Sequence, residues 1–154
     1  MEQLKKYLPH LLVLICMAAL SLAYMSPVLD GDQVWQSDIV HYKGMAKEIV
    51  DFREANNDEE PIWTNSMFSG MPAYQISVRH PGNWSKTILQ ILNFGLPRPA
   101  NYLFLLMAGK YFMFIVLGLG WRTALIGAAG FAFCSYSFII MEVGHTSKLH
   151  AMAF

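Results

Sequence analysis

LPHLLVLICMAALSLAYM, residues 8–25, is an apolar run without a single Asp, Glu, Lys or Arg. At about 1.5 Å of rise per residue, a helix of this length just spans a hydrocarbon core of about 30 Å. Two further apolar runs follow at 101–120 and 123–141. With 55% hydrophobic and 14% charged residues, the composition lies outside the ordinary soluble range. The sequence therefore predicts an all-α membrane protein with transmembrane helices.

The charges that flank these runs predict their orientation. Lys5 and Lys6 precede the first run, and Arg122 lies in the tight connection between the second and the third. Short cytoplasmic segments are enriched in Lys and Arg, so both sites and the N-terminus are expected in the cytoplasm. The expected segments are a first transmembrane helix (1–25), an outer, periplasmic loop (26–100), second and third transmembrane helices (101–120 and 123–141), and an outer connection that begins a fourth span (142–154).

A cleaved signal peptide is the alternative for residues 1–23. Lys5, Lys6, the apolar core and Ser21-Leu22-Ala23 resemble its three regions. The apolar run exceeds the usual length of about 7 to 15 residues, and two more runs follow, which favours a retained helix. The sequence ends on a new apolar run at 149–154. We therefore expect this chain to be a fragment of a larger membrane protein.

The outer loop is too long for a simple linker, because loops above about 12 to 15 residues are usually functional or disordered. Two amphipathic helices are predicted in it. Ser37 or Asp38 is expected to cap the first, which the polar run 56–61 ends. The second opens at 81–83 and presents Trp84 with an apolar stripe, a pattern that suits a helix in the plane of the lipid headgroups.

Asp38 is the carboxylate that we select as the functional acid. Backbone N–H groups at a helix start keep such a group ionised. It could then accept a proton from a hydroxyl nucleophile or hold a divalent cation. The alternative is a plain helix cap.

Three other features could contribute to function, two of them on the outer side. His145 and Lys148 follow the third apolar run and could stabilise a phosphate leaving group, or they could simply be a polar helix end. Segment 63–74 could line a sugar site, or its aromatics could pack on the outer ends of the helices. Lys110 lies mid-span and must face protein, where it finds either a carboxylate or an anionic lipid-linked substrate.

The chain resembles the YfhO-like bacterial membrane proteins, whose architecture is that of GT-C glycosyltransferases. The resemblance rests on one N-terminal span, the element Asp38-Ile39-Val40-His41-Tyr42, the element Ser66-Met67-Phe68-Ser69-Gly70-Met71-Pro72-Ala73-Tyr74, and Gly144-His145-Thr146-Ser147-Lys148. It implies a multi-pass protein of the bacterial inner membrane and a fragment of a larger GT-C-like fold. Gly70-Met71-Pro72 departs from the more glycine-rich turn of many relatives.

The implied reaction moves a sugar from a polyprenyl phosphate carrier to an outer-surface glycan, polymer or lipid acceptor. Asp38 would be the general base or would organise a divalent cation, the one cofactor this reading admits. The implied substrate contacts are Tyr42, Asn65, Tyr74, His145 and Lys148. The second hypothesis is a non-catalytic membrane component for the transport or assembly of lipid-linked glycans. Both readings imply membrane lipid as a partner and no nucleic acid.

Overall fold

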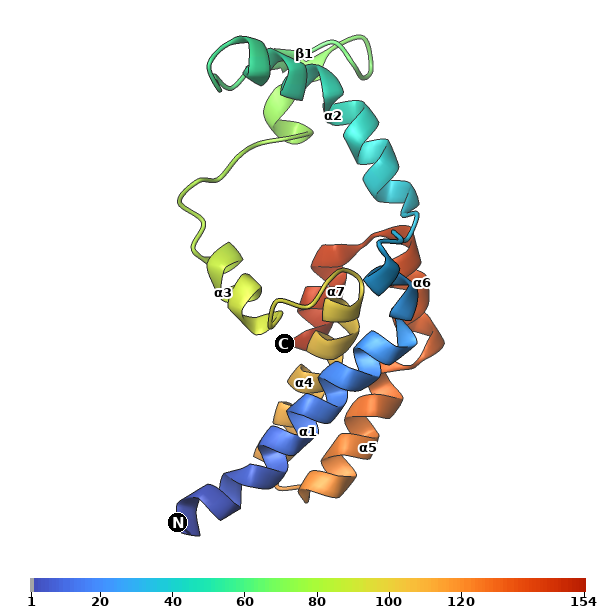
Figure 1. Cartoon of the computed structure of the whole chain (residues 1–154). Helices are drawn as coiled ribbons and strands as arrows, with labels where there is room; N and C mark the ends of the chain where they lie inside the picture. The colour runs from blue at the N-terminus through green and yellow to red at the C-terminus, as the bar shows by residue number, and fades with distance from the viewer. Residues whose placement is uncertain (1) are drawn as a thin grey trace.

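The computed structural model of the chain describes residues 2–154, so Met1 of the predicted segment 1–25 lies outside the described residues. Figure 1 shows a helical bundle with a long excursion at one end. The helices are α1 (Glu2–Tyr24), α2 (Ser37–Ala55), α3 (Ser85–Leu92), α4 (Ala100–Val116), α5 (Trp121–Ala132), α6 (Ser135–Val143) and α7 (Thr146–Ala153). The short 3₁₀ helices η1 (Ser26–Asp30) and η2 (Ala73–Gln75) and the strands β1 (Trp63–Thr64) and β2 (Met71–Pro72) complete the fold.

The bundle consists of α1, α4, α5, α6 and α7, with α4 at its centre. α4 packs against α1, α5 and α7, and its residues Leu103, Leu106 and Met107 have no exposed surface. Alanines at 124, 128 and 132 recur every four residues on α5 and are equally buried, which allows close helix packing. His10 of α1 and the hydroxyl of Tyr111 of α4 are 2.7 Å apart, a polar contact within this apolar core.

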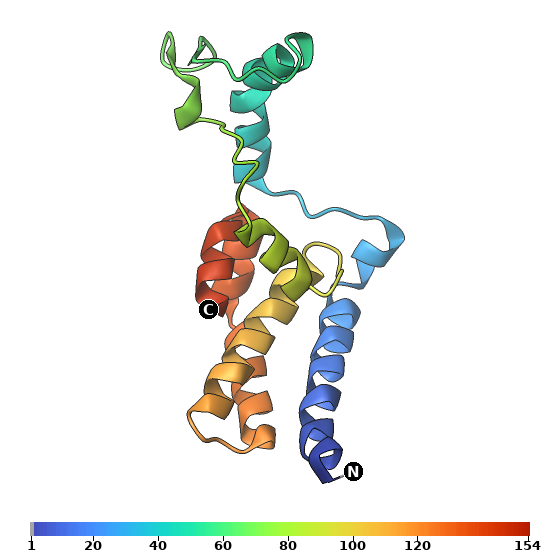
Figure 2. The same cartoon turned by 90° about the vertical axis from the view of Figure 1, so that its left-hand side faces the viewer.

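α1 has the length and composition to cross a membrane over Lys5–Tyr24. α4 is apolar but shorter than the predicted second span. The N-terminus and the α4–α5 connection lie at one end of the bundle, and the excursion leaves from the other end in both views (Figures 1 and 2). Lys5 and Arg122 therefore share one end, the arrangement that the charge pattern predicts.

The third apolar run is not one continuous helix, contrary to the prediction for 123–141. α5 and α6 meet at an angle of 48°. Cys134 adopts an extended conformation, and its thiol lies 3.3 Å from the hydroxyl of Ser137, which also contacts the carbonyl of Phe131. A serine hydroxyl that hydrogen-bonds to a nearby backbone group competes with the backbone hydrogen bonds of a helix. Periodicity alone could not reveal this break.

Lys110 faces protein, as expected for a lysine in an apolar helix. Its Nζ lies 4.8 Å from the centre of the Phe131 ring on α5. The contact is a cation–π interaction. The two partners considered for Lys110 from the sequence, a carboxylate and an anionic lipid-linked substrate, stay predictions.

The excursion, residues 26–99, lies outside the bundle. α2 begins beside α6 and projects outward, and α3 lies on the segment that returns to the bundle (Figures 1 and 2). The outer lobe, residues 45–79, lies at the far end of α2. Its strands pair in antiparallel register, Trp63 with Pro72 and Thr64 with Met71. The chain as a whole is mostly helical, as the sequence predicts, and this short pairing is a local departure that the sequence did not predict.

Candidate functional site at the junction of α2 and α7

The structure brings Asp38 and His145 into direct contact. Asp38 Oδ2 and His145 Nε2 are 2.6 Å apart, although the two residues come from opposite halves of the chain. Both side chains are about half exposed, at 47% and 48%. A carboxylate held by an imidazole and open to solvent is suited to receive a proton from a hydroxyl group.

Gly144 explains why His145 reaches α2. This residue ends α6 with a φ of 99°, in the left-handed region that favours glycine. The backbone N–H groups of Gly144 and His145 both bond to the carbonyl of Ile140, at 3.2 and 3.1 Å. A Cβ at position 144 would lie 3.0 Å from the side chain of Ile39. The turn therefore needs glycine both for its backbone and for the close approach of α2.

Asp38 is not a helix cap. α2 begins at Ser37, its N-cap position is Gln36, and no side chain there bonds to the helix start. The carboxylate of Asp38 instead turns to His145. The Gln36 amide donates a 2.6 Å hydrogen bond to the carbonyl of Met141 at the end of α6. The Gln36–Met141 and Asp38–His145 contacts thus join the start of α2 to the end of α6 and the turn that follows it.

Lys148 and Tyr42 lie close to this pair in the chain but have partners of their own. Lys148 lies on α7 with its Nζ 5.1 Å from the centre of the Tyr136 ring. The Tyr42 hydroxyl, one turn beyond Asp38, donates a 3.1 Å hydrogen bond to Ser77. Lys148 is an exposed cation near His145, whereas Tyr42 ties α2 to the returning chain.

Asn65 and Tyr74 belong to the outer lobe. The backbone N–H of Asn65 donates a 2.9 Å hydrogen bond to Glu48, and the Tyr74 side chain is largely exposed. The Asp38–His145 pair lies at the opposite end of α2, which projects away from the bundle (Figure 1). The six predicted site residues therefore divide between two places, with Asp38, His145 and Lys148 at the bundle.

Sequence reasoning missed the polar contacts that hold the outer lobe together. The buried Arg53 donates from Nε to Glu60 at 2.9 Å and from a terminal nitrogen to the Ser77 carbonyl at 3.0 Å. Glu48 accepts hydrogen bonds from the Thr64 hydroxyl at 2.7 Å and from the Asn65 N–H. The Thr64 hydroxyl lowers the pKa of the Glu48 carboxyl, because the ionised form accepts that bond.

The donor set at the junction does not complete a metal site. Asp38 and His145 supply one carboxylate and one imidazole, and no group of three or more His, Cys, Asp or Glu residues with metal-binding geometry occurs among residues 5–154, whose side chains the structure describes. The divalent cation considered from the sequence stays a prediction, since Mg²⁺ is commonly held by one or two carboxylates together with substrate phosphates. Comparison with known proteins does not add to the site, since no family model, curated protein or solved structure matches the chain.

Proposed function

We propose that this chain is part of a membrane glycosyltransferase that moves a sugar from a polyprenyl phosphate carrier to an acceptor on the outer surface. The observation that carries the proposal is the 2.6 Å contact between Asp38 and His145. It supports a single site that contains the predicted base and one of the groups predicted to face the phosphate. The substrate class comes from the likeness to YfhO-like proteins in short motifs.

The membrane location is part of the proposal. α1 exposes Leu11, Leu12 and Ile15 on its outer face, each more than half accessible. α4 and α5 likewise expose Phe112 and Ile126. Exposed apolar side chains on three helices of the bundle favour contact with lipid or with another protein. If Lys5 and Arg122 mark the cytoplasmic end, the Asp38–His145 pair lies on the opposite, periplasmic face of the bacterial inner membrane.

In the proposed reaction Asp38 is the general base. Its carboxylate takes the proton of an acceptor hydroxyl while the hydroxyl oxygen forms a bond to the anomeric carbon of the sugar. The bond between that carbon and the carrier phosphate oxygen breaks, and its electron pair leaves with the phosphate. His145 positions the Asp38 carboxylate, and Lys148 supplies positive charge for the departing phosphate. Tyr42 would contact substrate only after releasing Ser77.

The test uses the full-length protein in its native membranes with labelled polyprenyl phosphate sugars. Asp38→Asn at matched abundance is expected to lower carrier-dependent transfer by about 100-fold or more, the usual contribution of a general base. Asp51→Asn is the control, because Asp51 is an exposed carboxylate on the same helix that pairs with Lys47. Equal transfer in wild type and Asp38→Asn would remove Asp38 from the chemistry.

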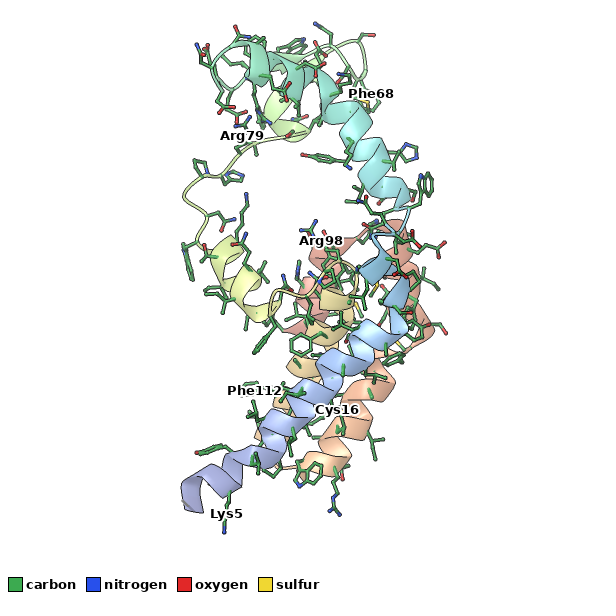
Figure 3. The ribbon with its side chains drawn as sticks, in the orientation of Figure 1. Lys5, Cys16, Phe68, Arg79, Arg98 and Phe112 are labelled. Atoms are coloured by element: carbon green, nitrogen blue, oxygen red, sulfur yellow. The ribbon has the colours of Figure 1, made fainter. Side chains whose placement is uncertain are left out.

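A second function has an observation of its own. The outer lobe exposes Ile62 and Phe68 at 85% and 84%, and Figure 3 shows Phe68 far from the bundle. These exposed apolar side chains favour a partner-binding surface, as expected of a non-catalytic membrane component for the transport or assembly of lipid-linked glycans. Absence of transfer from every donor, together with loss of glycan export in an Ile62→Ser/Phe68→Ser variant, would favour this function over the enzyme.

A further inference from the structure

A pocket of about 490 Å³ lies between the start of α2 and the entry to α4. Neither Asp38 nor His145 lines it, although Gln36 and Ile39 on either side of Asp38 do. Its walls come from three segments, the extended chain before α2, the first turns of α2, and the turn that begins α4. The lining residues are Gln33, Val34, Trp35, Gln36, Ile39, Val40, Lys43, Arg98, Pro99 and Tyr102.

The charged groups of this pocket are both cations. Lys43 and Arg98 line it, and none of the lining residues is Asp or Glu. Among residues 5–154, for which side chains are described, neither cation has a carboxylate within ion-pair distance. Arg98 is exposed at the bundle end that faces the excursion (Figure 3). Two unneutralised cations on one cavity wall favour an anionic ligand.

Tyr102 forms part of the pocket wall beside Arg98. It lines the pocket and is only 2% exposed, and its hydroxyl is buried without a hydrogen-bond partner in the described part of the chain. The Arg98 guanidinium lies 6.0 Å from the centre of the Tyr102 ring, within cation–π distance. The ring therefore supports the guanidinium at the pocket, while the hydroxyl is closed off from a ligand.

The remaining walls are partly apolar. Val34, Trp35 and Pro99 line the pocket, and Trp35 is largely exposed. A free inorganic ion would leave these surfaces without contact. A ligand that carries its anionic group next to an apolar or aromatic-stacking moiety uses both kinds of wall.

We propose that this pocket binds a phosphate group joined to an apolar moiety, with Arg98 and Lys43 as the cations that hold the phosphate. Arginine matches phosphate oxygens with two parallel donors, whereas lysine acts as a point charge. A lipid headgroup and a soluble phosphate ester share this chemistry. Binding here does not depend on sugar transfer, so the site stands even where the proposed transferase activity fails.

The experiment follows Trp35 by fluorine NMR in the full-length protein labelled with 5-fluorotryptophan. A Trp35→Phe variant assigns the resonance. Phenyl phosphate is titrated into the protein in zwitterionic detergent, and nanodiscs of phosphatidylcholine with and without phosphatidic acid form the second arm. A saturable shift with phenyl phosphate indicates a soluble ester, and a shift only with phosphatidic acid indicates a lipid headgroup.

Variants decide whether the shift reports the proposed contacts. Arg98→Gln is expected to weaken binding about tenfold or more, because it removes a charge-assisted pair of hydrogen bonds. Lys43→Gln is expected to weaken it less, and Arg98→Lys to restore part of the loss. Arg122→Gln is the matched control, since Arg122 stacks on Trp121 at the other end of the bundle.

Two results would overturn the proposal. One is the absence of a saturable Trp35 shift with either probe in the wild-type protein. The other is an unchanged midpoint in Arg98→Gln while the fluorine spectrum of the remaining tryptophans shows an intact fold. Because the readout is binding at Trp35, neither result is confused with failure of glycosyl transfer.

Discussion

The bundle and the outer lobe are held together by different forces. In the bundle, Leu103, Leu106 and Met107 of α4 are completely buried among apolar side chains. In the outer lobe few apolar residues are buried, and the chain is tied by the hydrogen bonds of Arg53 and Glu48. Apolar packing is insensitive to pH, whereas bonds to ionised groups depend on protonation. The two parts should therefore respond differently to the same perturbation.

The largest expected effect tests the bundle side of this comparison. Leu106→Ala removes a completely buried side chain from α4 and should cost about 2–5 kcal/mol of unfolding free energy, because the neighbours fill such a cavity only partly. Unfolding in mixed micelles measures the loss. Leu12→Ala, which truncates a side chain that is 57% exposed on α1, should stay within about 0.5 kcal/mol. Equal losses in both would contradict the assignment of α4 as the core.

Arg53→Met tests the lobe side. Arg53 is 3% exposed, and Met keeps much of its apolar stem while removing the bonds to Glu60 and Ser77. The expected cost is about 2–3 kcal/mol, the usual range for buried bonds to a charged group. Hydrogen exchange of peptides covering residues 60–79 measures it locally, and the peptides of α4 should keep their protection.

Lys47→Met is the control for Arg53. Lys47 pairs with Asp51 on the same helix, but both side chains are more than half exposed. Exposed pairs of this spacing contribute about 0.3–0.5 kcal/mol, so exchange in the lobe should change little. A loss of protection that spreads from the lobe into α4 in Arg53→Met would mean that the two parts unfold together.

Gly70→Ala should have a smaller effect in the hairpin turn. Gly70 has a φ of 117°, and a Cβ there would lie 2.7 Å from the indole of Trp63. Trp63 can rotate, so the backbone strain sets most of the expected cost of about 1–3 kcal/mol. Exchange of the β1 and β2 amides measures it. Gly82→Ala is the matched control, because nothing lies within 4 Å of a Cβ at that position.

Local sequence features predicted much of the fold, since the helices depend mainly on neighbouring residues. The polar run after Ala55 ends α2, and the prolines at 97 and 99 precede α4. The break at Cys134 escaped prediction because it depends on the hydroxyl of Ser137, which a hydrophobic pattern does not register. The hairpin was missed because its strands are only two residues long.

The candidate site shows the same limit more sharply. Asp38 was selectable from its place at a predicted helix start and His145 from its place after the third apolar run, but their contact depends on the Gly144 turn and on the angle at which α2 leaves the bundle. Arg98 stands between two prolines, and nothing in the neighbouring sequence marks it. The pocket proposed to bind phosphate forms only where the turn before α4 meets the start of α2. Nonlocal contacts of this kind carry no local signature.

The smallest expected effect concerns pH and the outer lobe. The pKa of Glu48 is lowered in the folded lobe by the Thr64 hydroxyl, so its contribution to stability is complete above its ordinary pKa of 4.5. This contribution is lost as the pH falls through the lower, folded value. The resonance of fluorine-labelled Trp63, next to Thr64, should report more lobe opening at pH 4 than at pH 7 in moderate urea.

Glu48→Gln separates this effect from the other acids of the lobe. Asp58 pairs with Arg79 and Glu60 with Arg53 in both proteins, so wild type and variant share the contribution of these pairs. The variant should be less stable than wild type at pH 7, and the difference should shrink as the pH falls. A difference that stays constant with pH would show that Thr64 and Asn65 bind the Glu48 side chain without regard to its charge. The Glu48 contacts would then resemble the packing of the bundle in being indifferent to pH.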